Sequence, residues 1–287
     1  MILLTGVTGK TGGEVARQLT AAGVPFRALV RNPAKADALQ AMHVDLVIGD
    51  VADDAVLDRA LEGIERALLV MPNGEDQLLL EKRFTRHAAR AGVQHLVKLS
   101  SLESVPESTN PITRTHVASE QYVRESGMAW TMIRPTFFMQ TFLGSATGIR
   151  ERRLIAMPAG AGTIAPTDLR DVGAVIRRVL TEPGHENQSY DLTGPDLLTL
   201  AEIAARFSAV LGREIRYVDQ PMAEFSTRLA ALNLTPWRIA AVCKEFEAIA
   251  AGVIDHTTDT IPRLLGRAPI SLEQFVRDHL ALFRQGP

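Results

Sequence analysis

The segment TGVTGKTG at residues 5–12 constrains the fold more than any other part of the sequence, because it joins an apolar run to a helical pattern. Gly6, Gly9 and Gly12 give the spacing Gly-x-x-Gly-x-x-Gly, a variant of the dinucleotide-binding fingerprint, between a first strand and a first helix. Glycine permits a tight turn and a close approach of the backbone to a pyrophosphate, and the helix N-terminus points free N–H groups at that anion. We therefore predict that a dinucleotide binds Gly6, Thr8, Gly9, Lys10, Thr11 and Gly12.

Two other interpretations of this segment are weaker. A nucleoside-triphosphate P-loop that includes Gly9, Lys10 and Thr11 needs a glycine where the chain has Leu4. A strand-to-helix turn without a ligand can have the same glycine spacing, which by itself is a weak signal. The strand–helix context and the amino-terminal position favour the dinucleotide site over both.

Short β-type runs alternate with helical patterns through the first half of the chain. The runs at 2–5, 26–30, 46–48, 67–70, 95–99 and 130–133 are predicted to be strands, and several are apolar throughout, as in parallel sheets that are covered on both faces. Between them, 13–22 and 53–61 carry apolar residues on one side and are predicted to be helices. The alternation predicts an α/β fold of the Rossmann type, with a doubly wound parallel sheet and right-handed crossovers.

The pattern changes past Arg150, where helical segments predominate and strand candidates are brief, near 164–166, 190–192 and 215–218. Thr199 with Glu202, and Ser271 with Gln274, match a capping box, so a helix is predicted to begin at each. We predict a nucleotide-binding domain at 1–150, completed by 164–193, and a smaller, mostly helical substrate-binding lobe at 194–287.

The end of the second predicted strand indicates which dinucleotide binds. A NAD-selective site usually has an acid there, about 20 residues past the glycines, to bind the ribose 2′-hydroxyl. No acid occurs between Val15 and Ala36, and Arg31 and Lys35 follow the strand instead. An arginine can pair in bidentate fashion with a 2′-phosphate, so the sequence predicts NADP(H) in preference to NAD(H). If Arg31 is only a solvated surface residue, the two cofactors should bind almost equally.

The residues that follow the third and fourth predicted strands complete the expected cofactor groove. Asp50 and Val51 are predicted to lie by the adenine, because they follow the third strand. Met71 and Pro72, after the fourth strand, are predicted to line the groove from the adenosine to the nicotinamide.

Composition excludes several function classes. The formal net charge is -2 and no block of like charge occurs, so we expect no nucleic-acid binding. The single Cys243 cannot form an intramolecular disulfide, which suits a reducing compartment and predicts a cytoplasmic protein. No segment reaches the ~18 uncharged apolar residues of a membrane helix, and no set of His, Cys, Asp and Glu has metal-ligand spacing. We expect neither a membrane anchor nor a metal, and a homo-oligomer remains open.

Several motifs resemble the NmrA-like, atypical short-chain dehydrogenase/reductase family, above all its branch of bacterial NAD(P)H:quinone and triphenylmethane-dye reductases. They are TGVTGKTG, VRNP, LSS, RPTFFMQTF, PTDLRDVGAV and YDLTGPDLLTLAEIAARFSAVLGREIRYV, which together span nearly the whole chain. The resemblance implies a Rossmann domain with a small carboxyl-terminal lobe over the nicotinamide end of the cofactor.

The catalytic pair of ordinary short-chain dehydrogenases is missing, because none of the three tyrosines is followed by a lysine in Tyr-x-x-x-Lys spacing. His116 and Glu120 occupy this region, one helical turn apart. In the resembled branch a histidine with a glutamate four residues later is common here. His116 is therefore a candidate to orient a substrate carbonyl or the nicotinamide ribose, or to supply a proton near neutral pH. The alternative is a histidine that serves packing.

Ser100 ends the fifth predicted strand, where it is predicted to hydrogen-bond the substrate or the nicotinamide ribose, or else to cap the loop. Lys98 lies inside the same strand, and we expect its side chain to reach solvent, with a buried lysine as the alternative. Phe137, Phe138 and Phe142 follow the sixth strand, where the resemblance implies the substrate pocket, with core packing as the alternative.

The function predicted from these features is an NADPH-dependent reductase that delivers hydride to a planar conjugated acceptor, such as a quinone or an enone. Such a small aromatic or quinone-like substrate accepts hydride with little help from an acid, because the negative charge delocalises over its conjugated system. Proximity and orientation would then be the main contributions of the protein. Two alternatives stay open: a regulator of the NmrA type that senses NADP(H) without chemistry, and a tailoring reductase of natural-product assembly.

Overall fold

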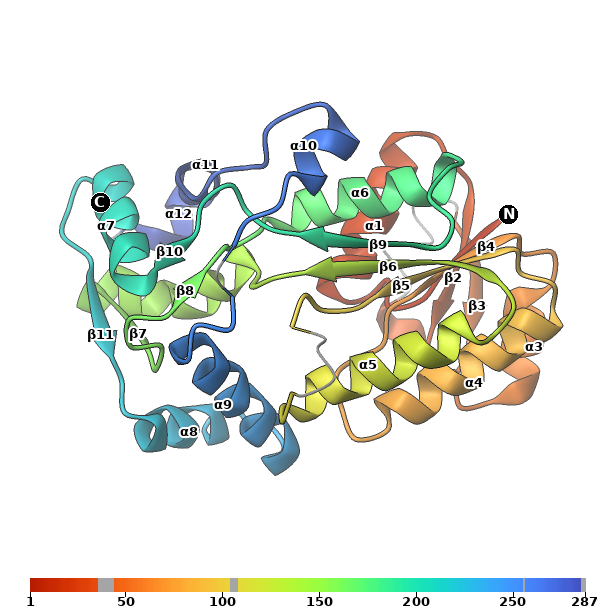
Figure 1. Cartoon of the computed structure of the whole chain (residues 1–287), viewed down its shortest axis with the longest axis horizontal. Coiled ribbons are helices and arrows are strands. Elements are labelled where there is room, and N and C mark those ends of the chain that lie inside the picture. The colour runs from red at the N-terminus through yellow and green to blue at the C-terminus, as the bar shows by residue number, and fades with distance from the viewer. Residues whose placement is uncertain (36–43, 104–107, 255, 285–287) are drawn as a thin grey trace. The chain divides into compact units, whose positions relative to one another are not determined.

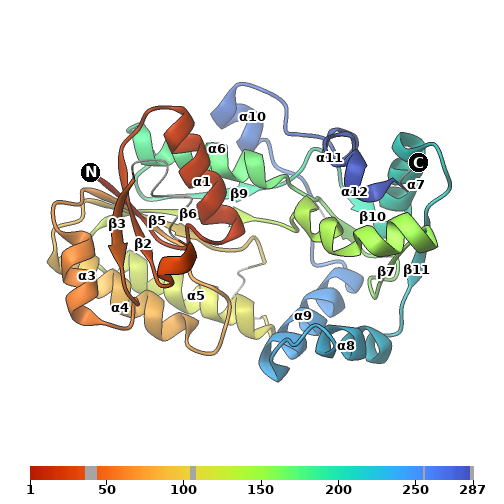
Figure 2. The same ribbon diagram turned by 180° about the vertical axis from the view of Figure 1, so that it is seen from behind.

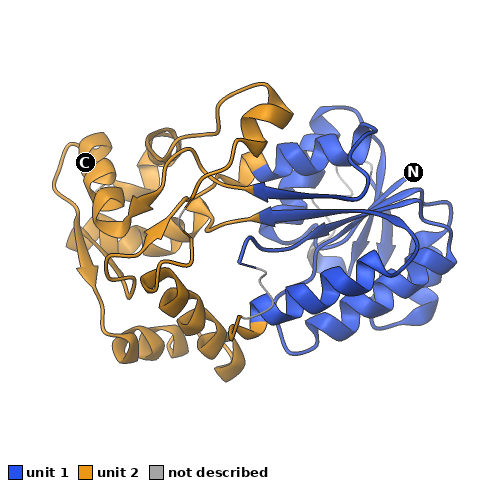
Figure 3. Cartoon of the chain, viewed as in Figure 1, with its two compact units in different colours: residues 1–107, 112–134, 172–191 blue, residues 108–111, 135–171, 192–287 orange. Residues whose placement is uncertain are grey.

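The computed structural model describes residues 1–35, 44–103, 108–254 and 256–284, which form two compact units. Unit 1 comprises Met1–Glu107, Ile112–Arg134 and Val172–Asp191, and unit 2 comprises Ser108–Pro111, Pro135–Asp171 and Leu192–Pro287 (Figure 3). The two units are interleaved along the sequence. The domain bounds expected from the sequence, 1–150 completed by 164–193 and a lobe at 194–287, stay a prediction.

Unit 1 is built on a sheet in which the described residues contribute seven strands, in the order β3-β2-β1-β4-β5-β6-β9. The strands are β1 Ile2–Leu4, β2 Phe26–Val30, β3 Asp45–Ile48, β4 Arg66–Leu69, β5 His95–Leu99, β6 Ala129–Pro135 and β9 Gln188–Leu192. The pairs from β3 to β6 are parallel. Asn187 N donates to Trp130 O and Thr136 N donates to Leu192 O, so β9 runs parallel to β6. The predicted doubly wound parallel sheet is confirmed, and its strand order reverses at β1, where such sheets bind ligands.

Helices cover both faces of this sheet, as Figures 1 and 2 show. They are α1 Lys10–Ala21, α3 Asp54–Leu61, α4 Gln77–Arg90, α5 Pro111–Arg124 and α6 Leu169–Thr181, with a short 3₁₀ turn η1 at Pro33–Lys35. Helix α3 buries Val56, Leu57, Ala60 and Leu61, the side predicted from the sequence, against a core shared with α4 and α5. On the other face α6 packs closely on α1, because a Cβ on Gly173 would lie 2.8 Å from Glu14 Cγ.

Two arginines at the amino ends of strands cap the carboxyl ends of helices in unit 1. Arg27 on β2 donates from Nη1 to the carbonyls of Ala60, in the last turn of α3, and Glu62, its C-cap. Arg66 on β4 does the same at the end of α6, where Nη1 donates to Leu180 O at 3.1 Å and to Glu182 O at 2.9 Å. A cation at this position satisfies carbonyls that have no partner within the helix and interacts favourably with the helix dipole.

Replacing Arg66 by methionine is expected to lower the free energy of unfolding by about 2 kcal/mol, since the half-buried carbonyls lose a charged donor. Methionine keeps most of the aliphatic volume, so the packing of β4 should survive. Urea denaturation followed by circular dichroism measures the change. The control is Arg86→Met on the exposed side of α4, which should shift the free energy by less than about 0.5 kcal/mol. Equal shifts in both variants would contradict the capping role.

Unit 2 contains two small strand pairs and most of the later helices. Strand β7 Leu154–Met157 runs parallel to β11 Arg216–Asp219, and β8 Thr163–Ile164 runs antiparallel to β10 Leu198–Thr199. The helical elements are η2 Met139–Ser145, η3 Gly148–Arg152, α7 Leu200–Leu211, α8 Met222–Ala230, α9 Pro236–Ala250, α10 Thr260–Leu265, α11 Leu272–Asp278 and α12 Leu280–Phe283. The candidate strands near 164–166 and 215–218 are confirmed as β8 and β11, and the one near 190–192 as β9 of the large sheet.

The helix starts predicted in this region are confirmed. Thr199 accepts from Glu202 N, and Glu202 reaches back to Thr199 N at 2.8 Å, so α7 begins with a complete capping box. Ser271 accepts from Gln274 N at 3.2 Å at the start of α11. Within the part of the chain that the structure describes, no helix combines the length and apolar character needed to cross a membrane.

Candidate functional site

The glycine loop joins β1 to α1 at the carboxyl end of the sheet, and its glycines are required for different reasons. Gly6 has φ +67°, and a Cβ there would lie 2.8 Å from Val70 O, so the loop approaches the residue after β4 too closely for a side chain. A Cβ on Gly12 would lie 2.4 Å from Gly6 O, so α1 can begin against the loop only with glycine at this position. Gly9 N donates to Gly6 O at 2.9 Å and closes the turn.

The first turn of α1 has the character of an anion site. Gly9 is the N-cap and provides no side-chain cap, and the turn contains no acidic residue. Thr8, Gly9 and Lys10 are exposed, whereas Thr11 is buried. The free N–H groups and the positive end of the helix dipole are therefore accessible beside a lysine, with no carboxylate in the turn to compete for them.

Thr5 fixes the loop to the neighbouring strand, a role that the sequence analysis missed. Its hydroxyl lies 3.0 Å from Leu68 O and 3.1 Å from Val70 O, and it accepts from Val70 N at 2.8 Å. These bonds hold the carboxyl ends of β1 and β4 together beneath Gly6. A buried threonine at the end of an apolar strand, directly before the first glycine, was the available signal.

The ends of β2 and β3 bring Arg31 and Asp50 together. The Arg31 side chain is 77% exposed, and its Nη1 lies 4.0 Å from Asp50 Oδ2. Asp50 also accepts from Ala52 N at 2.8 Å, which orients its carboxylate at the start of the loop before α3. Lys35 ends the η1 turn, and its side chain lies outside what the structure describes. Arg31 is thus an accessible guanidinium at the switch-point edge of the sheet, as its predicted role requires.

The other predicted groove residues follow β3 and β4. Val51 and Met71 are half-buried and pack against the core of unit 1. Pro72 is exposed. All three lie at the carboxyl ends of their strands, the edge to which β1 delivers the glycine loop, and their contact with a cofactor stays a prediction.

Lys98 on β5 is completely buried, so the expectation that its side chain reaches solvent is wrong. Its ammonium nitrogen lies 3.1 Å from Glu81 Oε2 on α4 and donates to Leu99 O at 3.0 Å. It also lies 3.1 Å from His116 Nδ1 on α5. Gln77 Nε2 donates to the other Glu81 oxygen at 3.0 Å. A lysine is buried only when a counter-charge accompanies it, and Glu81 supplies that charge from a helix earlier in the chain.

Ser100 and Glu120 belong to a second polar cluster beside the first. The Ser100 hydroxyl donates to Glu120 Oε1 at 2.6 Å, and Arg134 Nε donates to the same oxygen at 2.8 Å. Arg124 Nη2 donates to Glu120 Oε2 at 2.7 Å, and Arg134 Nη2 binds that oxygen as well. The Ser100 proton is committed to Glu120, so any hydrogen bond that its oxygen makes to a ligand is made as acceptor.

The charge states of His116 and Glu120 follow from these contacts. Burial, and then the positive charge of Lys98, hold the pKa of His116 well below its ordinary value. Burial alone would raise the pKa of Glu120, but hydrogen bonds from Arg134 and Ser100 lower it below the ordinary value. His116 is therefore neutral and Glu120 ionised at neutral pH. Of the roles predicted for His116, orienting a carbonyl or hydroxyl fits a neutral ring, and releasing a proton from an imidazolium does not.

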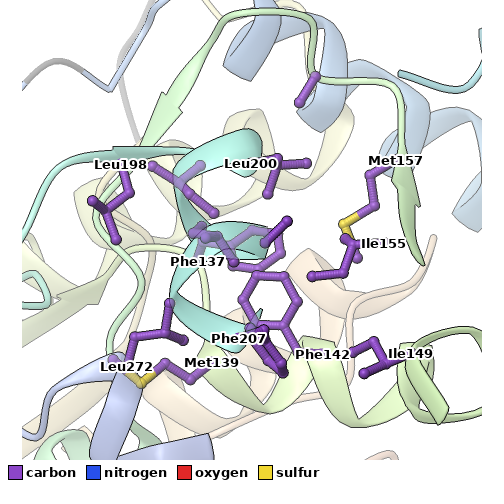
Figure 4. Close-up of a cluster of buried hydrophobic side chains, with 14 of the residues drawn as sticks. Phe137, Met139, Phe142, Ile149, Ile155, Met157, Leu198, Leu200, Phe207 and Leu272 are labelled. Carbon is purple, nitrogen blue, oxygen red and sulfur yellow. The ribbon is translucent and has the colours of Figure 1, made fainter. Parts of the chain in front are cut away.

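The three phenylalanines of the predicted substrate pocket belong to unit 2. Phe137 and Phe142 are buried, with ring centroids 5.6 Å apart, and Phe142 meets Phe207 of α7 edge-on at 5.6 Å. Figure 4 shows these rings inside a cluster of buried hydrophobic side chains. Phe138 is half-buried. The structure shows Phe137 and Phe142 as packing residues of unit 2, and their contact with a substrate stays a prediction.

Asp168 and Asp171 at the start of α6 are both buried and paired with arginines of unit 2. Arg170 binds Asp168 and Asp278, and Arg267 binds Asp171 at 2.6 Å, so the two acids anchor the later chain rather than form an acid pair for catalysis. Among the described residues, no group of three or more His, Cys, Asp or Glu side chains could hold a metal ion.

Comparison with known proteins places the chain among reductases of similar length. Residues 1–275 match the sequence model of the NmrA-like family. An NAD(P)H azoreductase of Xenophilus azovorans is 39% identical over 288 residues, 99% of this chain and 99% of that protein. The NADPH-dependent quinone oxidoreductase of Escherichia coli complexed with NADPH has a TM-score of 0.89 at 28% identity, over 98% of this chain and 100% of that one. The Citrobacter triphenylmethane reductase complexed with NADP(H) has a TM-score of 0.87 at 26% identity, over 97% and 99%.

Proposed function

The chain belongs to the NmrA-like family, and from this premise we propose that it is an NADPH-dependent reductase that transfers hydride to a planar conjugated acceptor, a quinone, an enone or a related electron-poor aromatic compound. The observation that carries the proposal is the glycine loop that delivers the uncapped first turn of α1 to the switch point of the sheet. Relatives whose names describe NAD(P)H-dependent azo-dye and quinone reduction support it.

The residues of the loop fit a dinucleotide pyrophosphate. Gly6, Gly9 and Gly12 keep the backbone free of side chains, and the N–H groups of Lys10, Thr11 and Gly12 form the first turn of α1. Thr8 and Lys10 are exposed beside it and would supply a hydroxyl and a cation to the phosphates. When bound, the reduced nicotinamide supplies the hydride.

Arg31 would bind the 2′-phosphate that distinguishes NADPH from NADH. Its guanidinium is exposed after the end of β2, and the carboxylate of Asp50, which follows β3, is 4.0 Å from it. A phosphate that carries up to two negative charges can displace this weak surface ion pair, because exposed pairs contribute less than about 1 kcal/mol. Lys35, one turn later, is proposed to assist.

Replacing Arg31 by alanine is expected to weaken NADPH binding by about 10- to 100-fold, the effect of losing a charged, bidentate contact. NADH binding should change by less than about twofold, because NADH has no 2′-phosphate. Isothermal titration calorimetry with both cofactors gives the ratio. Arg86→Ala removes an exposed arginine from α4, and it controls for the loss of one positive charge. An unchanged ratio of the two dissociation constants would show that another group recognises the 2′-phosphate.

The acceptor end of the proposed site consists of His116 and Ser100. The sequence contains no Tyr-x-x-x-Lys pair that could act as a proton donor. The neutral ring of His116 suits a hydrogen bond to the acceptor oxygen better than proton release. A conjugated acceptor tolerates this, because its oxygen gains electron density gradually and water can complete the protonation. The contact of Phe137, Phe138 and Phe142 of unit 2 with the planar ring is proposed from the sequence alone.

A steady-state assay tests the proposed function directly. Purified protein is mixed with NADPH or NADH and a panel that contains quinones, an azo dye, a triphenylmethane dye and, as a control, an aliphatic ketone. We expect NADPH oxidation with one or more conjugated acceptors and none with the ketone, which needs an acid to protonate its alkoxide. Calorimetry is run in parallel. Tight NADPH binding without turnover of any acceptor would favour a cofactor-sensing regulator instead.

A further inference from the structure

The environment of Lys98 determines what its ammonium group does. An ammonium group donates protons and cannot accept one. This one donates to Leu99 O at 3.0 Å, forms an ion pair with Glu81 Oε2 at 3.1 Å, and lies 3.1 Å from His116 Nδ1. The Lys98 and Glu81 side chains are 0% and 1% exposed. The two side chains form a buried ion pair, and removing either one would leave a buried charge without a partner.

The third partner has a consequence for the imidazole. Since a charged lysine can only donate, His116 Nδ1 must accept, and the single proton of the neutral ring is then on Nε2. Glu81 thus acts on His116 through Lys98 without touching the ring. The structure gives Nδ1 this one polar neighbour among the described residues.

We propose that the Lys98–Glu81 pair is a positioning device that keeps His116 as a neutral imidazole with its proton on Nε2, so that the ring is a permanent hydrogen-bond donor toward the acceptor oxygen. The donor role rests on the proposed function, whereas the tautomer and charge state are properties of the free protein. As hydride reaches the acceptor carbon, an electron pair moves to the acceptor oxygen, His116 stabilises it by donation and keeps its own proton, and water supplies the proton of the product.

The charged groups around the ring fit this assignment. On α4, Glu81 forms an ion pair with Lys98 and accepts a hydrogen bond from Gln77. On β5, Lys98 is the cation next to the ring. On α5 Glu120 is engaged by Arg124, by Ser100 of β5 and by Arg134 of β6. Lys98 is also the charged group that, after burial, contributes most to the lowered pKa of His116. A lowered pKa means that the ring stays uncharged down to a pH well below that of an ordinary histidine.

The first test needs no variant. Nitrogen-15 NMR of the protein labelled at histidine distinguishes a bare ring nitrogen from one that carries a proton. We expect His116, assigned by comparison with His116→Gln, to show a bare Nδ1 and a protonated Nε2, with no titration between pH 6 and 8. A proton on Nδ1 in the wild-type protein would overturn the proposal.

The second test removes the pair. Lys98→Met alone leaves Glu81 buried without a partner and threatens folding, so the informative variant is the double substitution Lys98→Met with Glu81→Gln, which removes both charges. We expect the titration midpoint of His116 to move upward, toward an ordinary histidine. Lys82→Met, at a half-buried lysine adjacent to Glu81 in sequence, is the matched control and should leave the titration unchanged. An unchanged titration in a folded double variant would also overturn the proposal.

Turnover separates this proposal from the proposed function. In the wild type, kcat should be flat across the pH range in which an ordinary histidine titrates. In the double variant any pH dependence should move to higher pH than in the wild type, because the charge of Lys98 is gone while burial still lowers the pKa of His116. The double variant should also lose about tenfold in kcat, the effect of one misplaced hydrogen bond, with KM for NADPH within about twofold. A flat profile and full kcat in the double variant would refute the positioning role. Absence of turnover in the wild type would refute the proposed function and leave the NMR result standing.

Discussion

Replacing Gly9 by aspartate is expected to weaken NADPH binding by about 100-fold or more, while the free energy of unfolding stays the same or rises by up to about 1 kcal/mol. The two effects have opposite signs because they come from the same N–H groups. Gly9 is the N-cap of α1, with φ -95° and ψ 179°, an extended conformation that aspartate adopts readily. Aspartate is among the best N-cap residues and would accept from the first turn. It would also place a carboxylate where the pyrophosphate must bind.

The matched control is Gly9→Asn, which has the same size and capping ability without the charge. A Cβ at this position lies 3.2 Å from Gly6 O in either variant, so both require the same small shift of the loop. Calorimetry measures the affinity, and urea denaturation measures the stability. The expected order of affinity is wild type, asparagine, aspartate. If the aspartate variant bound NADPH as tightly as the asparagine variant, the anion would not be bound at the N-terminus of α1.

Replacing Glu81 by glutamine is expected to lower the free energy of unfolding by about 3–5 kcal/mol, because it leaves the buried ammonium of Lys98 without a counter-charge. Glutamine keeps the shape of the side chain and can still accept from Gln77, so the loss reports the charge. The double variant Glu81→Gln with Lys98→Met should recover to within about 1 kcal/mol of the wild type, since replacing both members of a buried pair is often nearly neutral.

Urea denaturation of the two single variants and the double variant forms a double-mutant cycle. The control is Glu62→Gln, at an exposed acid just after α3, which should cost less than about 0.5 kcal/mol. Additive losses in the cycle, with the double variant less stable than either single one, would contradict a coupled buried pair.

The parts of the fold that local pattern determines were predictable from the sequence. The strands predicted at Phe26–Val30 and His95–Leu99 coincide with β2 and β5, because strands buried on both faces carry apolar residues at consecutive positions. The glycine loop was also predictable from local sequence, because glycine adopts the positive φ of Gly6 without steric cost. The family resemblance is confirmed as well. By contrast, β7 at Leu154–Met157 was not predicted: it is short and is completed by β11, far along the chain.

The buried polar cluster could not be predicted, because its members come from separate elements. Lys98 in an apolar strand gave a choice between a buried lysine and one that reaches solvent, and only Glu81 decides it. Glu81 and Gln77 are four positions apart on α4, a spacing that equally suits an exposed helix face. His116 was singled out as a candidate from its sequence position, but its neutral state depends on its burial and on Lys98, which that position does not reveal.

The interleaving of the two units limits how the protein can be divided for study. A fragment that stops at residue 150 would lack α6 and β9, although both belong largely to unit 1. Its β6 would become an open edge, with unpaired backbone groups that invite association between copies. Arg66 would lose the carbonyls that it caps, and α1 would lose the helix that covers it. Experiments on cofactor binding therefore call for the intact polypeptide, because no single cut yields unit 1 with its surface closed.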